Sequence, residues 1–128
     1  MLKLTSDPRN VAAVESFVKR VVERYKLAPD VHGNILISLT EAVNNAIIHG
    51  NDQDESKTVK IQFQKQKNCL AIRVSDEGGG FDFHNLPDPT APENLTRVGG
   101  RGVFLMQQLS DKVRFHNNGS TVEMRFNL

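Results

Sequence analysis

The sequence predicts an α+β fold in which helices cover one face of a mostly antiparallel sheet. Two stretches in the first 50 residues carry apolar residues at three- and four-residue spacing, which is typical of amphipathic helices. Four later segments are rich in strand-forming residues and occur as neighbouring pairs joined by short polar turns. At 128 residues the chain fits one domain, so residues 1–128 are expected to form a single folded unit with a single site.

The first half of the chain is expected to hold a short strand and two helices. Leu2 to Thr5 alternates weakly and suits an edge strand, and Ser6-Asp7-Pro8 is a typical helix start. An apolar stripe then predicts a helix over residues 8–26. Ala28-Pro29-Asp30 begins a second helix, which Gly50 ends.

The next segments predict a hairpin and then a long loop. Thr58 to Gln64 and Leu70 to Ser75 read as two strands around the polar turn Lys65 to Asn68, with Val59, Ile61 and Phe63 on one face. Glycines and three prolines then prevent a regular element for roughly fifteen to twenty residues, a loop length that is usually functional or mobile.

The last part of the chain predicts a helix and a second hairpin. Val103 to Leu109 reads as a short helix that follows the glycines of residues 99–102. Lys112 to His116 and Thr121 to Asn127 read as two strands around Asn117-Asn118-Gly119.

Composition excludes several classes of protein. Sixteen basic and fifteen acidic residues give a net charge of +1 with no block of like charges, so direct nucleic-acid or anionic-membrane binding is not expected. No stretch resembles a leader or a membrane span, and we expect a cytoplasmic protein. Cys69 is the only cysteine, which rules out an internal disulfide, and we expect a buried thiol in a strand.

Glu41 and Asn45 are the first candidate site residues. They stand four positions apart on the second predicted helix, so they share a face, and neither belongs to its apolar stripe. A solvated helix face is the simpler interpretation of such a pair taken alone. Asn44 offers an alternative register, and the four-residue spacing from Glu41 favours Asn45.

Two glycine clusters add to this pair. Asp76 follows a predicted strand and precedes three glycines, where the backbone can approach a ligand and a carboxylate can accept a hydrogen bond from an amino group. Taken alone it also suits an ordinary Asp-x-Gly turn. Residues 99–102 precede a helix, whose free N–H groups can bind an anion. Neither cluster has P-loop or dinucleotide-fingerprint spacing.

The ordered combination of these motifs resembles the GHKL ATPase superfamily, which includes gyrase, MutL, heat-shock chaperone ATPases and sensor histidine kinases. Within this superfamily, the sequence of these motifs is most similar to the anti-sigma factor serine/threonine-protein kinases. The segments that carry this similarity are Ser38–Gly50 (SLTEAVNNAIIHG), Val74–Phe81 (VSDEGGGF), Gly99–Met106 (GGRGVFLM) and Asn118–Met124 (NGSTVEM).

The resemblance implies the Bergerat ATP-binding fold, a two-layer α/β sandwich with a mixed, mostly antiparallel sheet, and a site for ATP and Mg²⁺. Asn45 would hold the magnesium ion and Glu41 would act as general base. Asp76 would accept the adenine amino hydrogen, and residues 82–101 would form a lid over the nucleotide. The other nucleotide-binding positions that it implies are Gly78, Gly80, Gly100, Arg101, Gly102, Val103 and Thr121.

As to function, the resemblance implies a kinase that phosphorylates a serine of an anti-anti-sigma (STAS-type) protein and sequesters a sigma factor. It also suggests a homodimer. A nucleotide-dependent binding switch without phosphotransfer is one alternative, although a mere binder needs no base such as Glu41. A stand-alone histidine-kinase-like ATPase domain is another. None of His32, His49, His84 and His116 lies in a phospho-acceptor context.

Overall fold

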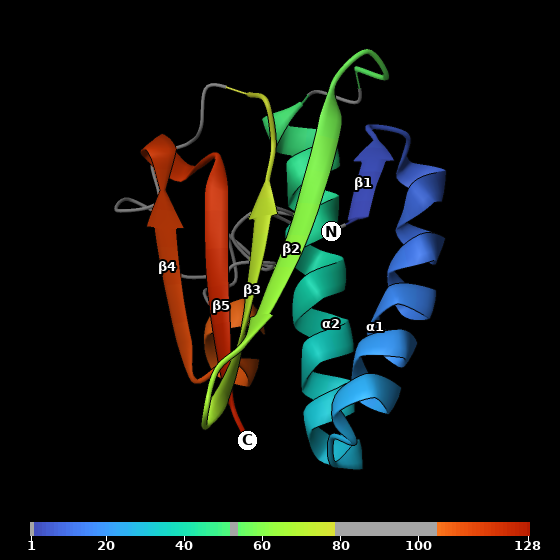
Figure 1. Cartoon of the computed structure of the whole chain (residues 1–128). Helices are drawn as coiled ribbons and strands as arrows, with labels where there is room; N and C mark the ends of the chain where they lie inside the picture. Colours follow the sequence, from blue (N-terminus) through green and yellow to red (C-terminus); the bar gives the residue numbers. More distant parts are fainter. Residues whose placement is uncertain (1, 52–53, 79–104) are drawn as a thin grey trace, which may run out of the picture.

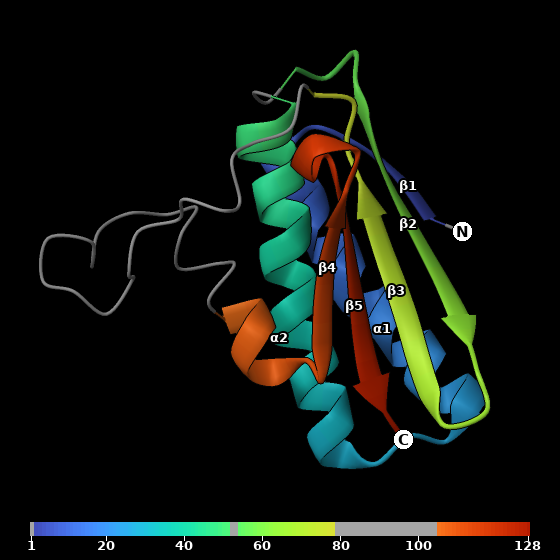
Figure 2. The same cartoon turned by 90° about the vertical axis from the view of Figure 1, so that its left-hand side faces the viewer.

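The computed structural model describes residues 2–51, 54–78 and 105–128, which form two layers (Figure 1). A five-stranded sheet makes one layer, and two helices cover one of its faces (Figure 2). The elements are β1 (Leu2–Thr5), η1 (Pro8–Val11), α1 (Ala12–Tyr25), α2 (Pro29–Asn45), η2 (Ala46–Gly50), β2 (Thr58–Lys65), β3 (Cys69–Ser75), β4 (Lys112–His116), η4 (Asn117–Gly119) and β5 (Thr121–Asn127). Residues 105–109 are also helical.

The sheet has the strand order β1-β2-β3-β5-β4, and each of its described pairings is antiparallel. The predicted α+β class and both predicted hairpins are thereby confirmed. Pairing of β3 with β5 places the end of the first hairpin beside the start of the last strand, with Ser75 opposite Thr121. This contact between distant parts of the sequence builds the upper end of the sheet in Figure 1.

The core lies between the sheet and α1 and α2, because alternate strand residues point toward the helices. Val59 and Ile61 are fully buried there, as predicted for their shared face. Phe63, on the same face, meets the rings of Phe17 and Tyr25 at centroid distances of 5.5 and 5.9 Å. These edge-on contacts fix α1 over β2.

The second helix begins at Pro29 and changes its hydrogen-bonding pattern near its end. Pro29 occupies the first turn, where its missing N–H costs nothing. After Asn45 the chain forms a π turn, closed by a 2.9 Å bond from the Asn51 N–H to the Ala46 carbonyl. The predicted end at Gly50 is confirmed, and the last turn is wider than an α-helix. Such π turns occur often at functional sites.

The prediction for Cys69 was wrong in part. Cys69 does lie in a strand, as the first residue of β3, but its side chain is only partly buried. Its Sγ lies 3.2 Å from Gln66 Oε1 in the turn before it. Because Leu70 points into the core, alternation directs Cys69 to the other face of the sheet.

In the described residues, no helix combines the length and the apolar character needed to cross a bilayer.

Candidate functional site

Glu41 and Asn45 lie on the last two turns of α2, and both are partly buried. Their neighbours Ala42 and Val43 are buried in the core, so the pair occupies the edge of the helix beside the core-facing stripe. This position gives both side chains a fixed backbone and access to a ligand.

Asp76 is anchored at the end of the sheet by hydrogen bonds on both sides. Its backbone N–H donates to the carbonyl of Ser120, which precedes β5, at 2.9 Å. Its Oδ1 accepts the N–H of Gly78 at 2.8 Å. The carboxylate is therefore held in a tight Asp-x-Gly turn, the local structure that residues of this type favour.

The Asp76 carboxylate meets the end of η2 at Gly50. A Cβ atom at Gly50 would overlap the Asp76 carboxylate, and a Cβ atom at Gly78 would overlap the Gly50 carbonyl group. Both positions therefore require glycine for close backbone approach. The contact joins the helical segment that carries Glu41 and Asn45 to the strand end that carries Asp76.

Burial raises the pKa of Asp76 above its ordinary value of 3.8, whereas the Gly78 N–H and the charge of Lys57 act in the opposite direction. The ionised carboxylate has thus lost more hydration than its protein partners restore. A ligand that donates a hydrogen bond would offset this cost. That property suits a carboxylate that recognises an amino group.

Thr121 lies in the same end of the sheet and is 6% exposed. Its hydroxyl donates to Ser75 Oγ at 3.1 Å and accepts from Asn117 Nδ2 at 3.3 Å. Ser75 immediately precedes Asp76, so Thr121 and Asp76 are placed by the same pair of strands.

Asn51 is a structural residue of the site that the sequence motifs did not reveal. It is fully buried directly after Gly50. Its Nδ2 donates to Ser6 Oγ at 2.9 Å and to the Thr58 carbonyl at 3.0 Å, and its Oδ1 accepts the Glu77 N–H at 2.8 Å. One side chain thus connects the helix end, the segment after β1, the start of β2 and the residue after Asp76. An asparagine that follows a helix-ending glycine is common in ordinary turns, so the sequence alone does not indicate this role.

Part of the predicted site lies outside the described residues: Gly80, Gly100, Arg101, Gly102 and Val103. No group of three or more His, Cys, Asp or Glu in the described part of the chain could hold a metal ion. A magnesium ion at Asn45 would therefore need oxygen ligands from the phosphates of a nucleotide, which is the usual way that Mg²⁺ binds.

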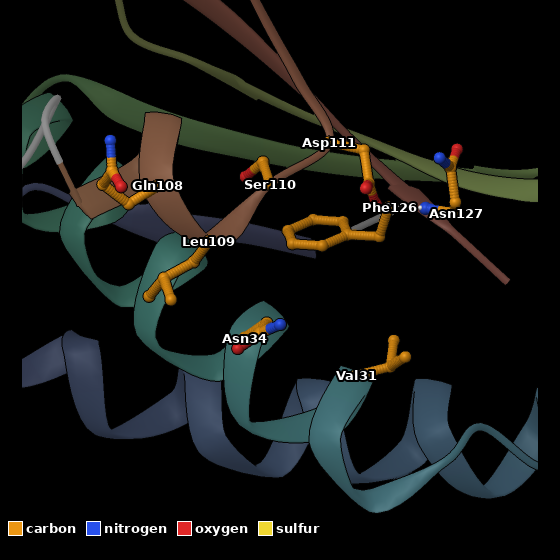
Figure 3. Close-up of a pocket in the computed structure, with 8 residues that line it drawn as sticks. All are labelled: Val31, Asn34, Gln108, Leu109, Ser110, Asp111, Phe126 and Asn127. Atoms are coloured by element: carbon orange, nitrogen blue, oxygen red, sulfur yellow. Dashed lines mark hydrogen bonds between the residues drawn. The ribbon is translucent and has the colours of Figure 1, made fainter.

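A separate pocket of about 300 Å³ lies near the N-terminal half of α2 (Figure 3). It is lined by α2, the segment 108–111 and the end of β5, and none of the predicted site residues lies in its lining. Its lining residues are Val31, Asn34, Gln108, Leu109, Ser110, Asp111, Phe126 and Asn127. This pocket is therefore distinct from the end of the fold where Asp76 and Gly50 meet.

Residues 4–126 match the family model of the histidine kinase-like ATPase domain. Together with the two-layer fold and the arrangement around Asp76, this match assigns the class of the protein: the chain belongs to the histidine kinase-like ATPase domain family.

Within that class the chain is similar to a particular group of kinases. It is 30% identical to the serine-protein kinase RsbW of Bacillus subtilis, over 96% of this chain and 81% of that protein. It is 27% identical to the RsbW of Oceanobacillus iheyensis, over 91% of this chain and 77% of that one. These matches confirm the predicted membership in the serine kinase group of the GHKL superfamily.

A solved structure supports the fold. The histidine kinase domain from the Erythrobacter litoralis EL346 blue-light activated histidine kinase superimposes with a TM-score of 0.55 and 17% sequence identity. The alignment covers 98% of this chain and 61% of that one.

Proposed function

We propose that this chain is an ATP-dependent protein-serine kinase that phosphorylates an anti-anti-sigma protein and, as an anti-sigma factor, sequesters a sigma factor. The similarity to the RsbW serine-protein kinases supports the kinase activity and suggests these partners. With such partners, we expect this chain to act in the cytoplasm. The observation that carries the proposal is the contact of Asp76 with Gly50, because it brings the segment of Glu41 and Asn45 together with the carboxylate that we propose to bind adenine.

The described residues fit a Mg-ATP site. Asp76 presents a partly buried carboxylate whose pKa is raised by burial, and the glycines at 50 and 78 allow the close backbone approach that positions it. Asp76 would accept the adenine amino hydrogen, and Thr121 would contribute from the adjoining strand. Guanine carries a carbonyl at the equivalent edge, so adenine should be preferred. Asn45 would bind Mg²⁺ through its carboxamide oxygen.

Glu41 would accept the proton of the attacking serine hydroxyl. It lies one helical turn before Asn45, so the base and the metal ligand are held at a fixed separation by the helix backbone. When bound, the magnesium ion would neutralise charge on the phosphates during transfer. The role of the protein is then to orient the hydroxyl and to hold its proton at the Glu41 carboxylate.

Incubation with labelled Mg-ATP and candidate anti-anti-sigma proteins tests the kinase activity. Wild type should label a serine of the partner, and Glu41→Ala should reduce the rate by roughly 100-fold or more while ATP binding persists. Glu23→Ala, an exposed glutamate on α1, is the matched control and should keep full activity. Nucleotide binding without any labelled partner would favour the binding switch instead.

The metal role of Asn45 can be separated from that of its neighbour. Asn44 and Asn45 are both partly buried on α2, so alanine substitutions at the two positions are closely matched. Titration calorimetry with ATP should show that Asn45→Ala abolishes the magnesium dependence of binding and that Asn44→Ala preserves it. The reverse result would transfer the metal role to Asn44.

A further inference from the structure

The sheet face that points away from α1 and α2 carries an excess of positive charge. Among the described strand residues on this face, Glu123 is the one acidic residue. We call this the basic sheet face; its positively charged residues are Lys3, Lys60, Arg73, Lys112, Arg114 and Arg125, together with the titratable His116. In the sequence these charged residues are separated by residues of the opposite sheet face, because side chains alternate along a strand. The sequence therefore contains no block of positive charge that would indicate this face.

Strand register concentrates these cations in adjacent rows. Arg73 and Arg114 lie on either side of Glu123, and Lys112 lies opposite Arg125. Neighbouring strands are about 4.8 Å apart, so the cations on β3, β5 and β4 lie within roughly 10–15 Å of one another. Like charges at this spacing repel in the absence of a counter-charge.

Glu123 organises the centre of this face. Its side chain is 7% exposed, with Oε1 at 3.1 Å from Arg73 Nε and Oε2 at 3.6 Å from Arg125 Nη2. His116 Nε2 lies 3.9 Å from Oε2. Within the described part of the chain, neither Arg125 Nε nor His116 Nε2 has a hydrogen-bond partner, although both atoms are buried. One carboxylate therefore faces several cationic groups, and the face keeps an excess of positive charge that further acidic groups would offset.

We propose that the basic sheet face docks an acidic surface of another protein. The complementary partner would present several Asp or Glu side chains, because guanidinium groups bind carboxylates through paired hydrogen bonds. Helix α2, which carries Glu41 and Asn45, covers the other face of the sheet (Figure 2), so this surface lies on the opposite side of the sheet from the proposed base and metal ligand.

Two other occupants fit the same face less well. Single-stranded nucleic acids are usually held by aromatic side chains that stack on bases, and no Phe, Tyr or Trp of the described strands points to this face. The net charge of the whole chain is only +1, whereas nucleic-acid-binding domains are usually strongly basic. A second copy joined through the same face would place like charges opposite one another.

The test uses the whole chain, labelled with ¹⁵N, and a poly-L-glutamate peptide of about 20 residues as the probe. The sheet-face variant is Lys112→Glu with Arg114→Glu, and the matched control is Lys19→Glu with Arg20→Glu on the exposed side of α1. Both variants change the net charge equally and alter exposed residues. Lys60→Glu, a single exposed change on β2, is the second variant if the first one unfolds.

We expect amide shifts in β3, β4 and β5 on peptide addition. The sheet-face variant should bind about tenfold more weakly or worse, and the control should stay within about twofold, because only the first removes charges from the docking surface. Equal weakening by both pairs would overturn the proposal, since binding would then follow net charge. Tighter binding of a DNA of equal charge at the same face would also overturn it. Sedimentation tests self-association: if the wild type is a dimer and the sheet-face variant is a monomer, the face joins two copies of this chain and the proposal is overturned.

Discussion

The carboxylate of Asp76 packs against the backbone of Gly50, so the end of the helical layer and the end of β3 are in direct contact. The two residues are 26 positions apart, and their contact joins the two layers at one end of the sheet. The proposed adenine-binding carboxylate is therefore positioned by the same segment that follows the proposed base and metal ligand. Stability and nucleotide binding should be coupled at this contact.

Gly50→Ala should disrupt this contact. The added methyl group would overlap the Asp76 carboxylate, so the strand end must move or the carboxylate must rotate away. We expect a loss of about 1–3 kcal/mol in the free energy of unfolding, as for other overpacked sites. ATP affinity should fall about tenfold or more, since a shifted Asp76 carboxylate cannot accept the hydrogen bond of the adenine amino group. Urea denaturation and titration calorimetry measure the two effects.

Gly33→Ala is the matched control for that substitution. Gly33 is exposed within α2, and a Cβ atom there would meet no atom within 4 Å. The same chemical change should therefore stabilise the protein by roughly 0.5–1 kcal/mol through the higher helix propensity of alanine. Similar losses at both positions would show that steric overlap with Asp76 is not the cause.

Asn51→Ala should be among the most destabilising single substitutions in this chain. It would leave the Glu77 N–H, the Ser6 hydroxyl and the Thr58 carbonyl without their present partner. An unsatisfied buried group costs about 1–3 kcal/mol, so we expect a total loss of about 2–4 kcal/mol. Chemical denaturation gives this value, with Asn68→Ala in an exposed turn as the control. A loss as small as that of the control would mean that water replaces the amide.

Much of the fold could be predicted from the sequence because each element has a clear local signal. The spacing of Val14, Phe17, Val18 and Val21 predicts the core side of α1, and all four are buried. The strand pairing β3 to β5 has no such signal, since it depends on contacts between residues about 50 positions apart. The π turn after Asn45 is also hidden, because its residues suit an α-helix equally well.

Parts of the candidate site could also be predicted from the sequence, whereas other parts depend on the three-dimensional structure. Asp76 could be proposed from its place between a predicted strand and three glycines, which allow a close backbone approach, and the family resemblance added Gly78. The need for glycine at position 50 follows only from the position of Asp76 in space, which the sequence does not show. The charge of the basic sheet face was missed for a related reason: the residues become neighbours only through register across β3, β5 and β4.

Asp76→Asn should stabilise the nucleotide-free protein at neutral pH. Burial raises the pKa of Asp76 above 3.8, so the folded state holds its proton more tightly than the unfolded state. Stability therefore falls as pH rises from 3.8 through the folded-state pKa, and the cost persists above it. Asparagine removes that cost and keeps an oxygen that can accept the Gly78 N–H.

The advantage of Asp76→Asn should shrink as the pH is lowered toward 3.8, where the wild-type carboxyl becomes neutral. Thermal unfolding of the wild type and of Asp76→Asn, measured at several pH values from 3.8 to neutral, compares their stabilities. ATP affinity should fall at neutral pH, because the charged acceptor is lost. A variant that is less stable than wild type at every pH would show that the negative charge itself supports the turn.

Glu123→Gln should produce the opposite pH dependence. Burial alone would raise the pKa of Glu123, but the hydrogen bond from Arg73 and the charges of Arg73, Arg125 and His116 lower it below 4.5. The ionised form therefore stabilises the folded state fully above pH 4.5, and this contribution is lost as the pH falls through the folded-state pKa. We expect a loss of about 1 kcal/mol at pH 7, limited by the exposure of Arg73.

The difference between Glu123→Gln and wild type should close as the pH falls from 4.5 through the lowered folded-state pKa of Glu123, below which both side chains are neutral. Urea denaturation at several pH values measures it, and high salt should reduce the difference at neutral pH. Glu15→Gln, an exposed glutamate on α1, provides the control and should change little at any pH. A pH-independent loss would mean that packing or hydrogen bonding, rather than charge, makes Glu123 important. A larger loss at pH 7 than at acid pH instead identifies its carboxylate as the group that holds the cations of the basic sheet face together.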